Sequence, residues 1–153
     1  MIVDNYIAYH LSLCDNEIGS LWPIINRSYS DCKSRKTEEI LDSYRNTLLI
    51  LTPRSRSLFV CSDNENVENW YLKKFKSKFP YLYTLRLTGE LNWVDAEEYE
   101  KLFAMVGKPC LDESKIKEIA MKYWDGINSN SSMYIEGLFV GDALILDKRL
   151  YIP

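Results

Sequence analysis

Histidine is almost missing from this chain, since His10 is the only one among 153 residues. The four cysteines, Cys14, Cys32, Cys61 and Cys110, form no C-x-x-C pair, and with one histidine they offer no plausible set of zinc ligands. We therefore expect no bound metal, and we interpret the cysteines as reduced, partly buried thiols. A nucleophilic pair of Cys61 with His10 stays open as an alternative, although no neighbouring residue supports it.

Long apolar runs and glycine-rich phosphate loops are missing as well. No stretch approaches the roughly 20 apolar residues that span a bilayer. The first ten residues carry Asp4 and no basic segment, unlike a secretory signal. We therefore expect a protein without membrane contact, in the cytoplasm of the producing cell or of a cell that receives it. Because G-x-G-x-x-G and G-x-x-x-x-G-K-[ST] are both absent, any nucleotide has to be bound by another scheme.

Excess positive charge is also lacking, because the formal net charge is −3. This balance argues against a large non-specific nucleic-acid footprint, which depends on cationic contacts to phosphates. Local basic segments do occur, namely CKSRK at 32–36, RSR at 54–56 and LKKFKSK at 72–78. Their simplest interpretation is a solvated surface.

The hydrophobic pattern that is present predicts an α+β protein with one domain over residues 1–153. Alternating or short apolar runs predict strands, and apolar residues at spacings of three and four predict helices. The predicted strands are 6–13, 57–62, 81–89, 133–141 and 143–152, the last two joined by a tight turn at Gly141-Asp142. The predicted helices are 37–51, one within 62–80, 96–106 and 112–124. The order mixes strands and helices without regular βαβ alternation.

Capping signals predict where two of these helices begin. Ser62 and Glu65 have the spacing of a capping box, and Asp63 is an alternative cap for the same helix. Asp95 and Glu98 repeat the signature before the helix at 96–106.

Three residues stand out within the predicted strands. His10 lies in the first strand, with Ser12 on the same face two residues later. Glu136 lies in an otherwise apolar strand, where a carboxylate is costly to bury unless it is paired or used. Phe59 is flanked by Ser57 in the central strand. A purely structural role for His10, a solvent-facing Glu136 and a core Phe59 are the simpler alternatives for each residue alone.

Four segments together resemble the ADP-ribosyltransferase superfamily, in particular its small bacterial branch that includes rifampicin ADP-ribosyltransferase. They are YIAYHLS, RSLFVCSDNENVENWYLKKF, YLYTLRLTGELNWVD and SMYIEGLFVGDALILDKR, and they cover most of the chain from residue 6 onward. The resemblance implies two small, mostly antiparallel sheets flanked by helices. It also implies that NAD, as a substrate, is bound in a cleft between these sheets without a glycine-rich loop.

The resemblance assigns roles around the NAD molecule. It implies that His10 hydrogen-bonds the 2′-hydroxyl of the adenosine ribose, and that backbone groups near Leu11 and Ser12 hold the nicotinamide carboxamide. Phe59 occupies the place of a tyrosine that stacks on the nicotinamide ring, so the stacking surface is kept and the hydroxyl is lost.

The same resemblance assigns the charged residues. Glu136 would contact the 2′-hydroxyl of the nicotinamide ribose and stabilise the positive charge that develops as the glycosidic bond breaks. Arg54 and Arg56 would meet the pyrophosphate. The chain differs from the family pattern at Leu11, where glycine is common, and at Tyr134, where arginine-directed enzymes carry a second glutamate or glutamine.

Two functions follow as expectations. The first is a bacterial mono-ADP-ribosyltransferase, a toxin-like enzyme that moves ADP-ribose from NAD to a protein, nucleic-acid or small-molecule acceptor, with an inhibitory partner protein as a further expectation. The second is an inactive binding protein of adaptor, antitoxin or immunity type on an α+β scaffold. Neither TGELNWVDAEEY nor INSNSS contains a readable acceptor code. The first function requires that His10 and Glu136 face a shared cavity beside Phe59.

Overall fold

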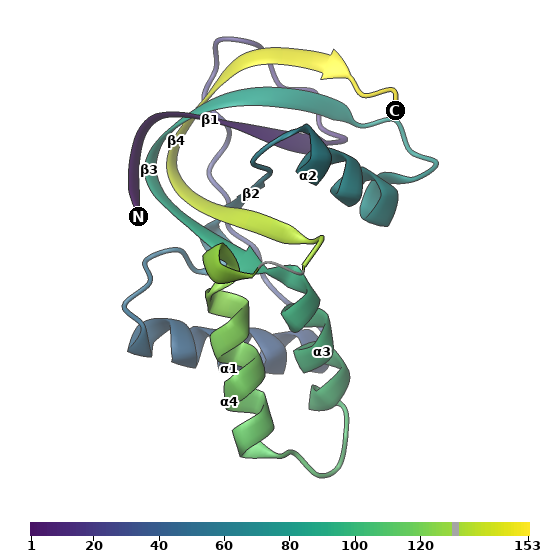
Figure 1. Cartoon of the computed structure of the whole chain (residues 1–153). Coiled ribbons are helices and arrows are strands. Elements are labelled where there is room, and N and C mark those ends of the chain that lie inside the picture. Colours follow the sequence, from purple (N-terminus) through teal and green to yellow (C-terminus); the bar gives the residue numbers. More distant parts are fainter. Residues whose placement is uncertain (130–131) are drawn as a thin grey trace.

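The computed structural model describes residues 1–129 and 132–153, and within them the chain is an α+β protein with four strands and four α-helices. The elements are β1 (Ile2–Ser12), α1 (Cys32–Thr47), β2 (Leu58–Val60), α2 (Asn64–Trp70), β3 (Tyr81–Asp95), α3 (Ala96–Val106), α4 (Glu113–Trp124) and β4 (Ile135–Leu150). A π-helical turn, Tyr71–Phe75, extends α2. Figure 1 shows the strands in the upper part of the molecule and α1, α3 and α4 below them. The predicted α+β class is therefore confirmed.

The four strands form one antiparallel sheet in the order β1-β3-β4-β2. The two ends of this order also meet, because the backbone groups of Tyr9 in β1 and Cys61 after β2 exchange hydrogen bonds of 3.0 and 2.7 Å. The sheet thus curls back on itself (Figure 1), and a seam joins β1 to β2. This seam brings His10 next to Phe59.

The curl depends on a pair of glycines at which β3 and β4 bend together. Gly89 and Gly141 are register partners with φ values of 155° and 146°. A Cβ atom on Gly89 would lie 2.3 Å from the Val140 carbonyl oxygen, and one on Gly141 would lie 2.4 Å from that of Thr88. Only glycine fits this close approach.

The expected division into two small sheets was therefore wrong, because the four strands form one sheet. The sequence pattern placed a strand end at Gly89 and a tight turn at Gly141-Asp142, whereas both strands continue through their glycines. Each long strand serves both halves of one bent sheet. A glycine inside a strand marks a bend or a close approach as readily as a turn.

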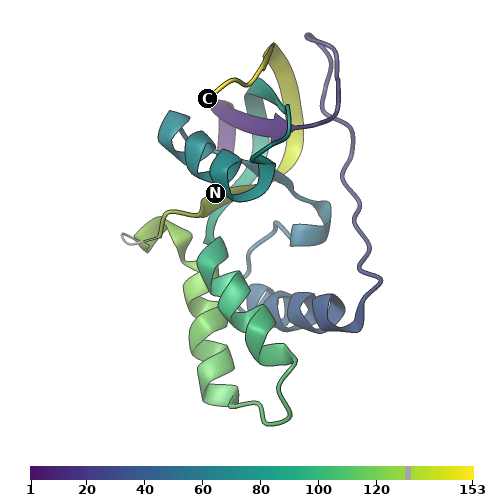
Figure 2. The ribbon, with the colours of Figure 1, turned by 90° about the vertical axis from the view of Figure 1, so that its right-hand side faces the viewer.

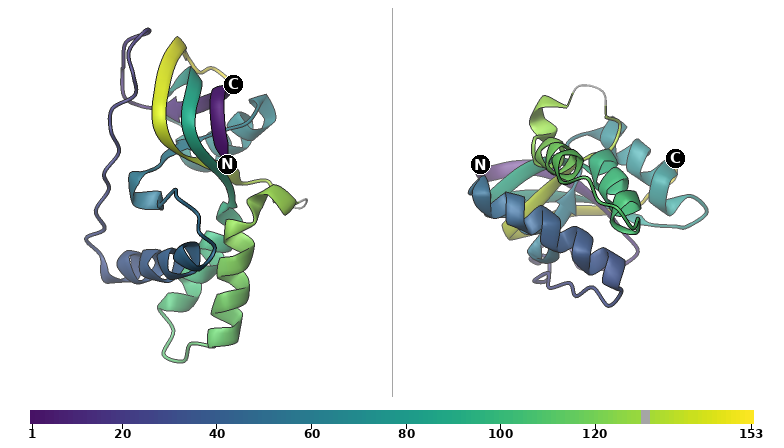
Figure 3. Two further views of the ribbon diagram at one scale, coloured as in Figure 1. Left: turned by 90° about the vertical axis from the view of Figure 1, so that its left-hand side faces the viewer. Right: turned by 90° about the horizontal axis from the view of Figure 1, so that it is seen from below.

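Two main cores lie on different faces of this sheet. The inside of the curl is filled by buried residues of all four strands, among them Ala8, Leu58, Tyr83 and Phe139. The second core lies where α1, α3 and α4 pack under the lower end of the sheet, around residues such as Tyr123. Figure 3 shows α1 crossing the side-by-side pair α3 and α4, while α2 lies against the upper part of the sheet. No helix in the described residues is long and apolar enough to cross a membrane.

Helix starts follow the aspartate caps. Asp63 caps α2 by accepting a hydrogen bond of 2.8 Å from the Asn66 amide, so the aspartate alternative is the observed one. The starts of α3 and α4 after Asp95 and Asp112 agree with the sequence. The start of α1 does not agree, because Asp31 caps it at Cys32, five residues before the predicted start at Thr37.

A long irregular segment, residues 13–31, links β1 to α1 and runs down one side of the molecule (Figure 2). Its backbone adds to the edge of β4 through hydrogen bonds such as Trp22 N to Ala143 O at 2.8 Å. Further along, the amide of Arg27 donates to the Ser55 carbonyl. The segment thereby carries Trp22 and Arg27 to the region of the β1–β2 seam.

Candidate functional site

The three residues that the sequence singled out meet at one hollow. His10 from β1, Phe59 from β2 and Glu136 from β4 all line a cavity of about 370 Å³, together with Leu11 and Ser12. We call it the His10 hollow. Its remaining wall includes Trp70, Lys74 and Phe75 from α2 and the turn after it. The seam between β1 and β2 and the closing strand β4 position these side chains.

His10 is neutral in this setting. Burial lowers its pKa from 6.5 to about 4, a hydrogen bond to Phe59 opposes this shift, and the positive charge of Arg27 adds to it. The Nδ1 atom lies 2.5 Å from the Phe59 carbonyl oxygen. Because a carbonyl only accepts, Nδ1 carries the proton and Nε2 is an acceptor. The imidazole also meets the ring of Trp22 edge-on, with centroids 4.7 Å apart.

The Nε2 atom of His10 is available to a ligand. No fully buried side-chain nitrogen or oxygen lacks a hydrogen-bond partner in the described part of the chain. Nε2 makes no hydrogen bond there and is therefore not fully buried, and the imidazole lines the hollow. His10 thus combines a structural hydrogen bond across the seam with one free acceptor.

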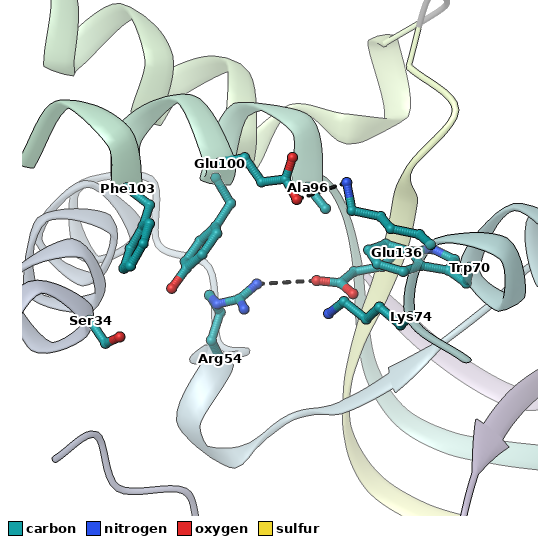
Figure 4. Close-up of a pocket in the computed structure, with 10 residues that line it drawn as sticks. Ser34, Arg54, Trp70, Lys74, Ala96, Glu100, Phe103 and Glu136 are labelled. Carbon is teal, nitrogen blue, oxygen red and sulfur yellow. Dashed lines mark hydrogen bonds and ion pairs between the residues drawn. The ribbon is translucent and has the colours of Figure 1, made fainter. Parts of the chain in front are cut away.

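Glu136 is held by a buried arginine. Arg54 Nη1 lies 3.1 Å from Glu136 Oε1, and Arg54 Nε lies 3.0 Å from Oε1 of Glu38 in α1. Arg54 Nη1 also donates to the hydroxyl of Tyr123 at 2.8 Å. Figure 4 shows the guanidinium pointing toward the Glu136 carboxylate, with a dashed line for the contact between them. Burial acts to lower the pKa of Arg54, but Tyr123 and the two carboxylates hold it well above its ordinary value.

One oxygen of Glu136 stays accessible. Oε1 is taken by Arg54, whereas Oε2 makes no hydrogen bond to the described residues. Because no fully buried polar side-chain atom of the described residues lacks a partner, Oε2 is not fully buried. Oε2 therefore keeps some exposure, although only 6% of the Glu136 side chain is exposed.

A second cavity, of about 490 Å³, adjoins the first at Glu136. We call it the Arg54 hollow, and Figure 4 draws its lining. It shares Trp70, Lys74 and Glu136 with the His10 hollow and continues toward α1 and α3, where Tyr99 and other side chains line it. A carboxylate thus stands at the junction of two adjoining spaces.

The two arginines assigned to pyrophosphate are placed differently from each other. Arg54 is engaged with Glu38, Glu136 and Tyr123 and has only 12% of its side chain exposed. Arg56 is exposed and lines a different cavity, together with Trp22. The structure therefore does not bring Arg56 to the His10 hollow.

Cys61 is unsuited to nucleophilic chemistry. Burial first, and then the charges of Glu136 and Asp63, raise the pKa of its thiol to about 12. The thiol is therefore protonated at neutral pH, and only a thiolate attacks well. Because the thiol keeps its proton, the alternative of a Cys61–His10 nucleophilic pair loses its basis. All four cysteines are free, and no cluster of three or more metal-ligating side chains occurs in the described residues.

Several residues of the site were not found from the sequence. The sequence pattern marks Lys74 only as part of a solvated basic segment and does not single out Trp70. Their spacing of four residues places them on one face of a helix, and this signal could have joined them. Glu38 and Tyr123 reach Arg54 only through the packing of α1 and α4, for which local sequence gives no signal.

The INSNSS segment, which includes residues 130–131, lies partly outside the described residues, so nothing about an acceptor loop follows from it. No curated protein matches this sequence. The profile of a family described as "Protein of unknown function (DUF2441)" matches residues 2–150, nearly the whole chain with both hollows, and the protein belongs to this family.

Proposed function

We propose that this protein is an NAD-dependent mono-ADP-ribosyltransferase with its active site in the His10 hollow. The observation that carries the proposal is that His10, Phe59 and Glu136, from three separate strands, line the same cavity. A site whose polar groups converge beside an apolar wall is the usual form of a small-molecule site.

The neutral groups of the hollow suit NAD. The free Nε2 of His10 can accept a hydrogen bond from a ribose hydroxyl, as a protonated imidazole could not. Phe59 offers an aromatic surface to the nicotinamide ring, and the backbone at Leu11 and Ser12 borders the same space. Lys74 lines both hollows, and we assign it, in place of Arg56, to the pyrophosphate.

The chemistry needs charge stabilisation more than a strong base. The bond between C1′ of the nicotinamide ribose and the ring nitrogen breaks, and its electron pair leaves with neutral nicotinamide. Glu136, with Oε1 fixed by Arg54 and Oε2 free, would stabilise the positive charge on the ribose. An oxygen or nitrogen of the acceptor then bonds to C1′ and releases its proton to solvent.

A second function is favoured by one feature of the same site. Arg54 neutralises part of the Glu136 charge, which weakens the stabilisation of a cationic transition state. An inactive binding protein on this scaffold would keep the hollow and lose the reaction. The two functions differ in whether bound NAD is cleaved.

The test is nicotinamide release from NAD, with an extract of proteins and nucleic acids as acceptors. Glu136→Gln should lower the rate about 10²–10³-fold, as removal of one transition-state contact does. His10→Asn keeps a donor at the Nδ1 position for Phe59 and removes the Nε2 acceptor, so we expect about tenfold loss, mainly in KM.

Lys117→Glu, on the exposed face of α4, is the matched control and should change neither value. An inactive wild-type protein, or equal rates in all variants, contradicts the enzyme. NAD-dependent thermal stabilisation without nicotinamide release supports the inactive binding protein instead.

A further inference from the structure

The three basic segments of the sequence meet around the Arg54 hollow. Ser34 of the segment 32–36, Arg54 of 54–56 and two lysines of 72–78, Lys73 and Lys74, all line this one cavity. The segments are far apart along the chain and come from α1, from the turn before β2 and from the turn after α2. A merely solvated surface gives no reason for such convergence.

Several cations here are not neutralised by carboxylates. Lys33 Nζ lies 4.3 Å from the centroid of the Phe103 ring, and Lys74 Nζ lies 4.8 Å from that of Trp70. Neither ammonium group forms an ion pair with a carboxylate of the described residues. Lys73, by contrast, is paired with Glu100 at 2.7 Å. Two cations beside the cavity are thus free to meet an anionic ligand.

The walls between these cations are aromatic. Trp70, Tyr99 and Phe103 line the hollow and are not all fully buried, and the rings of Tyr99 and Phe103 are nearly parallel, 13° apart. Figure 4 shows Phe103 and Trp70 on different sides of the cavity, with Lys74 near Trp70. Aromatic rings stack on nucleic-acid bases, and lysines follow the phosphates.

We propose that the Arg54 hollow is a binding site for single-stranded nucleic acid. An unpaired base enters the cavity against the aromatic side chains, and the flanking phosphates contact Lys33 and, when no NAD is bound, Lys74. A duplex cannot present a base in this way, because its bases are already stacked and paired. That the bound nucleic acid is the ADP-ribose acceptor beside Glu136 rests on the proposed function. The binding of single-stranded nucleic acid in this hollow does not.

Binding is measured by fluorescence anisotropy in the absence of NAD, with the full chain and a labelled oligothymidylate of about 12 nucleotides. The comparison probes are a duplex of the same length and an oligoglutamate peptide. We expect the single strand to bind at least tenfold more tightly than either. Affinity should fall with salt, with a slope that reports the number of phosphate contacts.

Variants then locate the site. The double variant Lys33→Glu, Lys74→Glu should weaken binding tenfold or more and reduce the salt slope. Lys117→Glu, which makes the same substitution once at an exposed position of α4, should have little effect and not half of that loss. Phe103→Leu keeps an apolar side chain and removes the stacking surface, and it should weaken binding about fivefold.

Equal binding of the peptide, or equal losses from the α4 variant and the double variant, would overturn the proposal. Absence of oligonucleotide binding at low salt would do so as well. A protein that binds the oligonucleotide and releases no nicotinamide supports this site while contradicting the NAD chemistry, so the two failures are distinguishable.

Discussion

The two hollows that meet at Glu136 share Trp70 and Lys74 and differ in the rest of their linings. The His10 hollow contains a neutral imidazole that burial keeps unprotonated, with Phe59 and other apolar neighbours. The Arg54 hollow contains a guanidinium held between two carboxylates, and Lys73 and Lys74 also line it. Glu136 thus borders one space with a neutral imidazole and a second space with more charged groups.

The two hollows show two different ways of burying a polar group. His10 gives up its charge and satisfies Nδ1 with a backbone carbonyl. Arg54 keeps its charge, because Glu38, Glu136 and Tyr123 together compensate the loss of water. The stability that depends on His10 should therefore change with pH, and the stability that depends on Arg54 should fall when any of its partners is removed.

The charged side should be the more fragile, and Arg54→Met tests this. The substitution leaves Glu136 and Glu38 without their common cation, so we expect the free energy of unfolding to fall by about 3–5 kcal/mol. Urea denaturation followed by tryptophan fluorescence measures the change. Arg56→Met, at an exposed neighbour, should cost less than about 0.5 kcal/mol. Similar losses in both variants would contradict the view that the Arg54 ion pairs hold this side together.

His10 should instead make the free energy of unfolding depend on pH. The folded-state pKa of His10 is lowered from 6.5 to about 4, so between these values the unfolded chain binds more protons. This contribution is present above pH 6.5 and is lost as the pH falls toward 4, up to about 3 kcal/mol in all.

His10→Asn removes the titrating group and keeps a donor to Phe59. Its free energy of unfolding should therefore decline less than that of the wild type over the same pH range. Denaturation series at several pH values give the difference, in which the carboxylates common to both proteins cancel. Parallel curves for the two proteins would show that His10 does not titrate as its burial indicates.

Phe59, which lines the neutral hollow, also contacts the charged groups. The guanidinium of Arg27 lies 4.1 Å from its ring centroid, and that of Arg54 lies 5.0 Å from it. Phe59→Leu keeps most of the apolar volume and loses these cation–π contacts, so we expect a destabilisation of about 1–2 kcal/mol. Thermal denaturation against Phe79→Leu, which changes a side chain that is 78% exposed, isolates the effect. An equal shift in both variants would argue against any contribution of the two guanidinium groups.

Local sequence signals predicted much of the fold. The strand around His10, the helices after Asp95 and Asp112 and the α+β class follow from alternation, helical spacing and caps. The bend at Gly89 and Gly141 could not be recognised, because a turn and a close approach both call for glycine. Asp31 was missed as a cap, because the first helical turn contains Lys33 and Arg35 and has no apolar residues at helical spacing.

The candidate site was predictable only in part. His10, Phe59 and Glu136 could be chosen because each interrupts or marks a strand, and they do line one cavity. The engagement of Arg54 could not be predicted, because its partners Glu38 and Tyr123 come from helices distant in sequence. The role of Arg54 between two carboxylates is a property of helix packing rather than of any local motif.

The paired glycines of β3 and β4 also restrict how relatives of this protein can vary in length. Adding one residue to β3 after Gly89, or to β4 before Gly141, would move the side chains beyond the insertion to the opposite face of the sheet. If the later side chains kept their faces instead, Gly89 would lose its register with Gly141, and a neighbouring residue with a Cβ atom would meet a carbonyl at the bend. Insertions and deletions among family members should therefore be confined to connections such as 13–31 and 107–112, and both strands should keep a constant length.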